Sequence, residues 1–234
     1  MGEREVAIVV GAGPGLGAAL ASRFATAGMA VALAARDRSR VDGLADGLVA
    51  AGGVARAYRC DATVETEVSA LFAAVGRDLG TPRLVVHNPS YFVMKPILEL
   101  TATDLEEAWR IACFGGFLVG RAAARAMLAA GRGTMLFTGS SPSVKAGAQF
   151  AAFGAAKFGV RALAQSMARE LGPKGIHVAH VVVDAPIDGP GNEAVPAEKR
   201  VSPAAIAEAF LFLHQQPPSG WTHELDLRPA ASKF

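Results

Sequence analysis

Short apolar runs alternate along this chain with longer stretches in which apolar residues recur at helical spacing. The runs that predict strands are 6–10, 30–35, 54–60, 84–87, 134–138, 177–183 and 224–227. The helical patterns lie near 16–27, 39–50, 64–79, 102–130, 150–171 and 203–215. Runs such as VAIVV and VAHVVV are apolar on both faces, which is typical of a parallel sheet covered by helices on each side. The alternation predicts one α/β domain over residues 1–234 with a doubly wound parallel sheet, whose ligands bind beyond the carboxyl ends of the strands.

One segment interrupts this alternation. Residues 184–202 read DAPIDGPGNEAVPAEKRVS and are rich in proline, glycine and charge. Because the segment follows a predicted strand, we expect a mobile flap beside the site, with a disordered connector as the alternative.

Composition narrows the function classes. The net charge is +2 with both signs mixed along the chain, so no basic stripe indicates nucleic-acid binding. Cys60 and Cys113 lie far apart and no His, Cys, Asp or Glu group has metal-ligand spacing, so free thiols and no metal site are expected. The start MGEREV is charged, the apolar run after it ends at Gly11, and no apolar stretch looks long enough to span a bilayer. We therefore expect a cytoplasmic protein without a membrane segment.

A glycine-rich loop joins the first predicted strand to the first predicted helix. Such glycines allow a tight turn and close approach of a pyrophosphate, while the helix N-terminus supplies free N–H groups and positive potential. This strand–turn–helix context predicts a Rossmann-type site for a nicotinamide dinucleotide. The residues of the loop expected to bind it are Gly11, Gly13, Pro14, Gly15, Leu16 and Gly17.

The end of the second strand indicates which dinucleotide binds. An NAD site places a carboxylate there to accept from the ribose hydroxyls, whereas this chain has Ala35 followed by Arg36. A guanidinium can hold a 2′-phosphate with paired hydrogen bonds, so NADP(H) is favoured. Asp37 adjoins, and a shift of one residue would make it a ribose ligand, so NAD(H) stays open as the alternative.

Taken together, these motifs resemble the short-chain dehydrogenase/reductase family over almost the whole chain. GAGPGLG resembles the family's TGxxxGxG with Val10 in place of Thr, CDAT its Asp–hydrophobic pair after the third strand, HNPS its NNAG, and DAPID its PG motif. The resemblance implies that Asp61 and Ala62 lie at the adenine, that Asn88 supports the site, and that Ala185 and Ile187 lie near the nicotinamide. His87 is expected on the adenine side.

The same resemblance places the catalytic groups and shows two departures. The family's YxxxK motif falls on Phe153 and Lys157, and its catalytic serine on Ser140. Phe153 has no hydroxyl to donate a proton, and Ala112 stands where the family has a supporting Asn. Lys157 keeps the expected role at the nicotinamide ribose. Tyr91 lies just past HNPS and is the candidate substitute proton donor, with an aromatic pocket wall as the alternative.

These residues leave several functions open. The first is an NADP(H)-dependent oxidoreductase that moves hydride to or from a small apolar substrate, with Ser140 polarising the acceptor. The second is a catalytically silent nucleotide sensor or partner protein, and the third is non-redox chemistry in the same pocket. Family resemblance implies a homodimer or homotetramer joined through the helices near 102–130 and 150–171. Five apolar residues are candidates for a pocket that favours apolar ligands, although such a stripe is more often part of the core: Phe92, Val93, Met94, Phe150 and Phe153.

Overall fold

The computed structural model describes residues 4–189 and 191–232. Its strands are β1 Val6–Val10, β2 Ala30–Ala35, β3 Val54–Arg59, β4 Pro82–His87, β5 Gly133–Thr138, β6 Ile176–Val183 and β7 Glu224–Leu227. Its α-helices are α1 Leu16–Thr26, α2 Ser39–Ala50, α3 Glu65–Asp78, α4 Ala102–Trp109, α5 Gly115–Ala130, α6 Ala151–Leu171 and α7 Pro203–Gln215. A π-helical turn, η1 Arg110–Phe114, joins α4 to α5, and a 3₁₀ turn, η2 Ser141–Ser143, follows β5.

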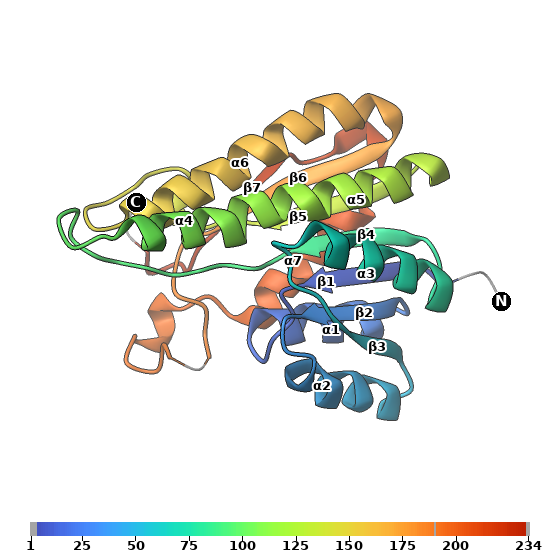
Figure 1. Cartoon of the computed structure of the whole chain (residues 1–234). Helices are drawn as coiled ribbons and strands as arrows, with labels where there is room; N and C mark the ends of the chain where they lie inside the picture. The colour runs from blue at the N-terminus through green and yellow to red at the C-terminus, as the bar shows by residue number, and fades with distance from the viewer. Residues whose placement is uncertain (1–3, 190, 233–234) are drawn as a thin grey trace.

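All these strands form one parallel sheet in the order β3-β2-β1-β4-β5-β6-β7 (Figure 1). The chain runs outward from β1 to β3 and then returns to place β4 on the other side of β1. The carboxyl ends of β1 and β4 therefore border the crevice where a doubly wound sheet binds its ligands. The predicted single-domain Rossmann architecture is confirmed.

Helices cover both faces of the sheet and bury two separate cores. One core packs α3, α4, α5 and α6 against residues such as Ile8 and Val10, and the other packs α1, α2 and α7 against Ala7 and Val9. Successive residues of a strand point to opposite faces, so burial on both faces requires the continuous apolar run VAIVV.

The long helical pattern at 102–130 departs from a plain helix. The π turn η1 divides it, and the imidazole of His87 makes a 2.9 Å hydrogen bond with the Ala112 carbonyl oxygen within that turn. His87 is therefore packed beneath the α4–α5 junction and does not line the crevice beyond β1 and β4, which corrects the expected adenine-side position. Burial lowers the pKa of His87 to about 3, so the ring is neutral.

The same run, residues 102–130, is long and apolar enough to cross a membrane by length and composition alone, contrary to the expectation that no apolar stretch has this length. Half of its most apolar window is buried within the molecule, as in the core helix of a globular protein. One such helix is weak evidence for a membrane span.

The described residues of the segment 184–202, which are 184–189 and 191–202, fold back on themselves between β6 and α7. Ile187 and Val201 form a parallel bridge, and the Asp188 amide donates to the Val201 carbonyl oxygen over 2.9 Å. Arg200 lies 2.7 Å from the Asp188 carboxylate. The segment is thus a looped excursion beside the carboxyl edge of the sheet (Figure 1).

Candidate functional site

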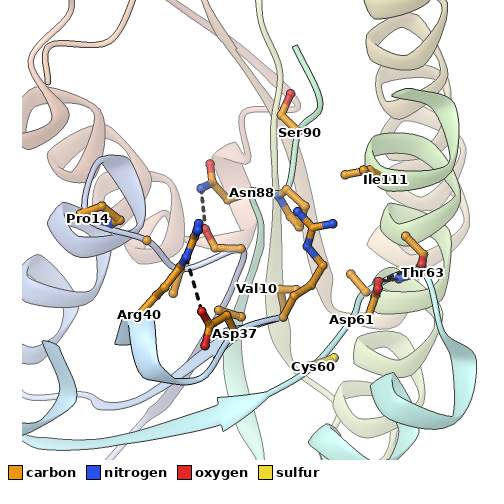
Figure 2. Close-up of a pocket in the computed structure, with 17 residues that line it drawn as sticks. Val10, Pro14, Asp37, Arg40, Cys60, Asp61, Thr63, Asn88, Ser90 and Ile111 are labelled. Carbon is orange, nitrogen blue, oxygen red and sulfur yellow. Dashed lines mark hydrogen bonds and ion pairs between the residues drawn. The ribbon is translucent and has the colours of Figure 1, made fainter. Parts of the chain in front are cut away.

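A cavity of about 660 Å³ opens at the carboxyl ends of β1, β2, β3 and β4 (Figure 2). This volume suits a small-molecule or cofactor site. The residues that line it are Val10, Gly11, Ala12, Gly13, Pro14, Ala35, Arg36, Asp37, Arg40, Cys60, Asp61, Ala62, Thr63, Asn88, Pro89, Ser90 and Ile111.

The glycine loop forms one wall of this cavity. Gly11 has a φ of +80°, and a Cβ there would lie 2.7 Å from the Pro89 nitrogen, so only glycine fits. A Cβ on Gly17 would meet the Ala12 Cα at 2.7 Å. A Cβ on Gly13 or Gly15 would meet nothing within 4 Å, so the loop leaves open space on that side. The first turn of α1 has no side-chain cap and no acidic residue, so its positive potential is available to an anion. The loop therefore fits the pyrophosphate of a dinucleotide.

Asn88 and Asp61 hold the walls in place. The Asn88 side-chain amide donates to the Gly11 carbonyl oxygen over 3.1 Å, and the Asp61 carboxylate accepts from the amide and the hydroxyl of Thr63, each over 2.8 Å (Figure 2). Burial raises the pKa of Asp61, but the Thr63 hydrogen bonds and the Arg36 guanidinium outweigh it, and the pKa lies below its usual value. Asp61 is a fixed anion at the far end of the cavity.

Three of the charged side chains that follow β2 line the cavity, namely Arg36, Asp37 and Arg40. The Asp37 carboxylate accepts from the amide of Ser39 over 3.1 Å and from its hydroxyl over 2.7 Å, and these bonds lower its pKa. One oxygen of Asp37 also lies 3.7 Å from Nε of Arg40 (Figure 2). Asp37 is thus engaged at the start of α2, and it lines the cavity together with Arg36 and Arg40. Sequence reasoning missed Arg40, although its spacing of four residues from Arg36 was a signal.

A second group of predicted residues lies at the end of β5 and the start of α6, outside this cavity. Lys157 is 3% exposed and donates to the Thr138 carbonyl oxygen over 2.9 Å. Burial lowers the pKa of Lys157 to about 8. The Ser140 hydroxyl is buried and has no hydrogen-bond partner among the described residues, and the same is true of the Thr138 hydroxyl. Buried hydroxyls without partners cost free energy, and a bound ligand or water can satisfy them.

Aromatic rings surround Phe153. Its centroid lies 5.3 Å from that of Phe92 and 6.4 Å from that of Phe150, and Lys157 Nζ lies 5.7 Å from the ring centroid. Phe92 is 66% exposed, whereas Phe153 is buried. Tyr91 is half-buried against the core beneath α4 to α6. The rings make an apolar surface that begins in solvent at Phe92 and ends at Phe153.

The sequence did not predict the polar network that forms after β6. The Ser141 hydroxyl donates to the Asp184 carboxylate, whose other oxygen lies 3.1 Å from the Arg228 guanidinium. Ser141, Asp184 and Ala185 line a neighbouring cavity of about 400 Å³. Asp184 thereby connects the loop after β5 to the chain beyond β7. Only the tertiary structure reveals this link, because its three members are far apart in the sequence.

The structure therefore divides the predicted site residues into groups. Gly11, Gly13, Pro14, Arg36, Asp61, Ala62 and Asn88 share the larger cavity. Leu16 and Gly17 are buried in α1, and Gly15 is its N-cap. Ile187 packs against the core beneath α1 and α7.

Comparisons with known proteins agree with this geometry. The family model for short chain dehydrogenases matches residues 5–195. D-threitol dehydrogenase of Mycolicibacterium smegmatis is 30% identical over 221 residues, which cover 89% of this chain and 85% of that protein. 7alpha-hydroxysteroid dehydrogenase of Escherichia coli K12 is 29% identical and covers 92% of this chain, which spans 88% of that protein.

Two solved structures show the same fold. A short-chain dehydrogenase from Rhodopseudomonas palustris superposes with a TM-score of 0.86 at 41% identity, covering 96% of this chain and 98% of its own. A metagenomic short-chain oxidoreductase in complex with NADP gives a TM-score of 0.84 at 28% identity, with 97% and 98% covered. The chain therefore belongs to the short-chain dehydrogenase/reductase family of oxidoreductases.

Proposed function

We propose that this protein is an NADP(H)-dependent oxidoreductase that moves hydride to or from the carbonyl or hydroxyl carbon of a small apolar substrate, with an incomplete set of the family's catalytic groups. The observation that carries the proposal is the glycine cradle beside two cavity-lining arginines. A related structure holds NADP, which supports the choice of nucleotide.

The charges after β2 favour NADP(H) over NAD(H). A carboxylate that binds ribose hydroxyls accepts hydrogen bonds from them. In Asp37, Oδ1 already accepts two hydrogen bonds from Ser39, and Oδ2 lies 3.7 Å from Nε of Arg40. Arg36 and Arg40 add positive charge at the same edge. A guanidinium matches the geometry of a phosphate, so a 2′-phosphate fits here better than a bare hydroxyl.

At the other end of the site, the lysine and the serine have separate roles. The bound cofactor supplies or accepts hydride at its nicotinamide ring. Lys157 donates one of its three N–H groups to the Thr138 carbonyl oxygen, which leaves two for other acceptors such as a ribose hydroxyl. The unpartnered Ser140 hydroxyl is suited to donate to a substrate oxygen. Phe153 replaces the family's tyrosine and contributes only an apolar surface.

Turnover is favoured over silent nucleotide binding. The curated relatives cited above are named as dehydrogenases, and the buried Ser140 hydroxyl needs a partner that a substrate oxygen can supply. The exposed ring of Phe92, continuous with Phe150 and Phe153, favours an apolar substrate. A polyol substrate, such as the threitol named for one relative, would leave these rings in contact with water.

The experiment is NADPH oxidation over a panel of ketones, aldehydes and imines that includes apolar cyclic members. Steady consumption that falls by about 10²-fold or more in Ser140→Ala supports the function, because removal of one donor to a developing oxyanion costs this much. Ser219→Ala, in the distant turn Pro218–Gly220, is the matched control and keeps the wild-type rate. Tight NADPH binding without consumption over the whole panel would instead identify a nucleotide sensor.

We also propose that the protein assembles as a homodimer or homotetramer through α4, α5 and α6. Trp109, Phe117 and Phe158 are each 40–45% exposed on these helices, and Phe114 stacks between the rings of Trp109 and Phe117. Contiguous exposed aromatic rings are typical of an association surface. Light scattering should give a multiple of 24.1 kDa, and Trp109→Lys should reduce it to the monomer mass.

A further inference from the structure

Lys157 is an unusual lysine because it is buried without a counter-ion. Among the described residues, no carboxylate forms an ion pair with it, and its hydrogen bond goes to the neutral carbonyl of Thr138. Burial alone lowers the pKa of Lys157 to about 8. An amine in this state can hold a proton near neutral pH and can also release it.

The titratable groups that face Lys157 from neighbouring elements do not change their charge near pH 8. His87 on β4 and His180 on β6 flank Phe137 of β5 in the sheet register, and both feel the charge of Lys157. Burial lowers the pKa of His87 to about 3 and that of His180 to about 4, so both rings are neutral above pH 5. Arg161, one turn further along α6, donates two hydrogen bonds to the Glu224 carboxylate. Lys157 is therefore the group in this region whose charge changes near pH 8.

The Phe153 ring favours the protonated form of Lys157, although the ring itself has no proton to donate. The ammonium of Lys157 lies 5.7 Å from the ring centroid, within the range at which an aromatic face attracts a cation. The hydroxyls of Ser140 and Thr138, at the end of β5, are buried and unpartnered. A protonated amine, an apolar wall and unpartnered hydroxyls thus come together at the end of β5 and the start of α6.

We infer that Lys157 is the catalytic acid of this enzyme, delivering the proton that a tyrosine hydroxyl cannot deliver here. The inference rests on the proposed oxidoreductase function. A bound reduced nicotinamide would supply hydride to the carbonyl carbon, and the C=O π electrons would then move onto oxygen. That oxygen takes a proton from Lys157 Nζ, directly or across one water molecule. The products are the alcohol, the oxidised nicotinamide and a neutral amine, which solvent reprotonates.

The test measures the pH dependence of carbonyl reduction by the full chain at saturating NADPH. Reduction needs the protonated amine, so the wild-type kcat should fall as pH rises through about 8. Lys157→Arg keeps the positive charge but cannot release a proton in this range, so kcat should drop by about 10²–10⁴-fold and the break near pH 8 should vanish. Lys174→Arg changes an exposed lysine outside the site and should keep both the rate and the break.

A second readout needs no turnover. In protein labelled with ¹³C at the lysine ε-carbons, the resonance that disappears in Lys157→Met should titrate near pH 8 in the wild-type protein. The titration itself is recorded on the wild-type chain, and the folded Lys157→Met variant serves only to assign the resonance. Addition of NADPH should shift this resonance, since the same amine contacts the ribose.

The outcomes separate the acid role from the function on which it rests. Turnover whose pH profile is unchanged in folded Lys157→Arg overturns the acid role and leaves the oxidoreductase standing. A Lys157 resonance that titrates above pH 10 does the same. Absence of NADPH consumption by wild-type protein over the whole panel overturns both.

Discussion

Substitution of Arg36 by glutamine tests the nucleotide preference most directly. Arg36 lines the larger cavity immediately after β2, and no acidic residue in the described part of the chain forms an ion pair with it. Its guanidinium is therefore available to a 2′-phosphate. Arg38 lies two residues further along the chain, outside the cavity, and forms an ion pair with Asp42 at 2.9 Å. Arg38→Gln is therefore the matched control.

The expected loss of NADPH affinity in Arg36→Gln follows from the solvent exposure of Arg36. Hydrogen bonds to a charged group contribute about 1.5–3 kcal/mol. Because Arg36 is solvent-exposed, the lower end applies, and about 1.4 kcal/mol corresponds to a tenfold change in affinity. Arg36→Gln should therefore weaken NADPH binding about tenfold and leave NADH binding unchanged. Arg40→Gln should have a smaller effect, because Arg40 lies within 3.7 Å of the Asp37 carboxylate.

Isothermal titration calorimetry with NADPH and NADH measures both affinities for wild type and the two variants. Exposed charges are screened over about 8 Å at physiological salt, so the NADPH preference should also shrink at high ionic strength. Equal affinity for the two nucleotides in the wild-type protein would refute the reasoning. So would an Arg36→Gln variant that binds NADPH as tightly as the control.

Three further predictions concern the rest of the molecule. Phe153→Tyr should raise the rate of carbonyl reduction at pH 7 by about 10-fold or more by restoring a hydroxyl; an unchanged rate would contradict the position assigned to this ring. Gly11→Ala, at a φ of +80° and against Pro89, should lower the free energy of unfolding by about 2 kcal/mol or more in urea titrations, and wild-type stability would contradict it. Hydrogen bonding from Arg161 lowers the pKa of Glu224 to about 2, so its contribution to stability is present above about pH 4.5 and is lost as pH falls toward 2. Thermal melts of Arg161→Met across that range should show a weaker pH dependence than wild type, and identical slopes would refute this.

The fold and the nucleotide-binding half of the site were determined by local sequence. Continuous apolar runs such as VAIVV are typical of strands buried on both faces in a parallel sheet covered by helices, and the alternation of strands and helices predicted the doubly wound parallel sheet that the structure confirms. The glycine loop was recognisable because a tight turn and a close backbone approach both need glycine, and these needs arise within seven consecutive residues.

The tertiary structure decided what depends on residues that are distant in the sequence. It directed the Asp37 carboxylate to Ser39, paired Ser141 with Asp184, and placed His87 against the π turn at Ala112. It also buried Lys157 without a counter-ion, which sequence alone could not reveal because an isolated lysine on a helix is usually solvated. Strand and turn propensities depend on neighbours along the chain, whereas desolvation and hydrogen-bond partners depend on what the folded sheet and helices bring around a side chain.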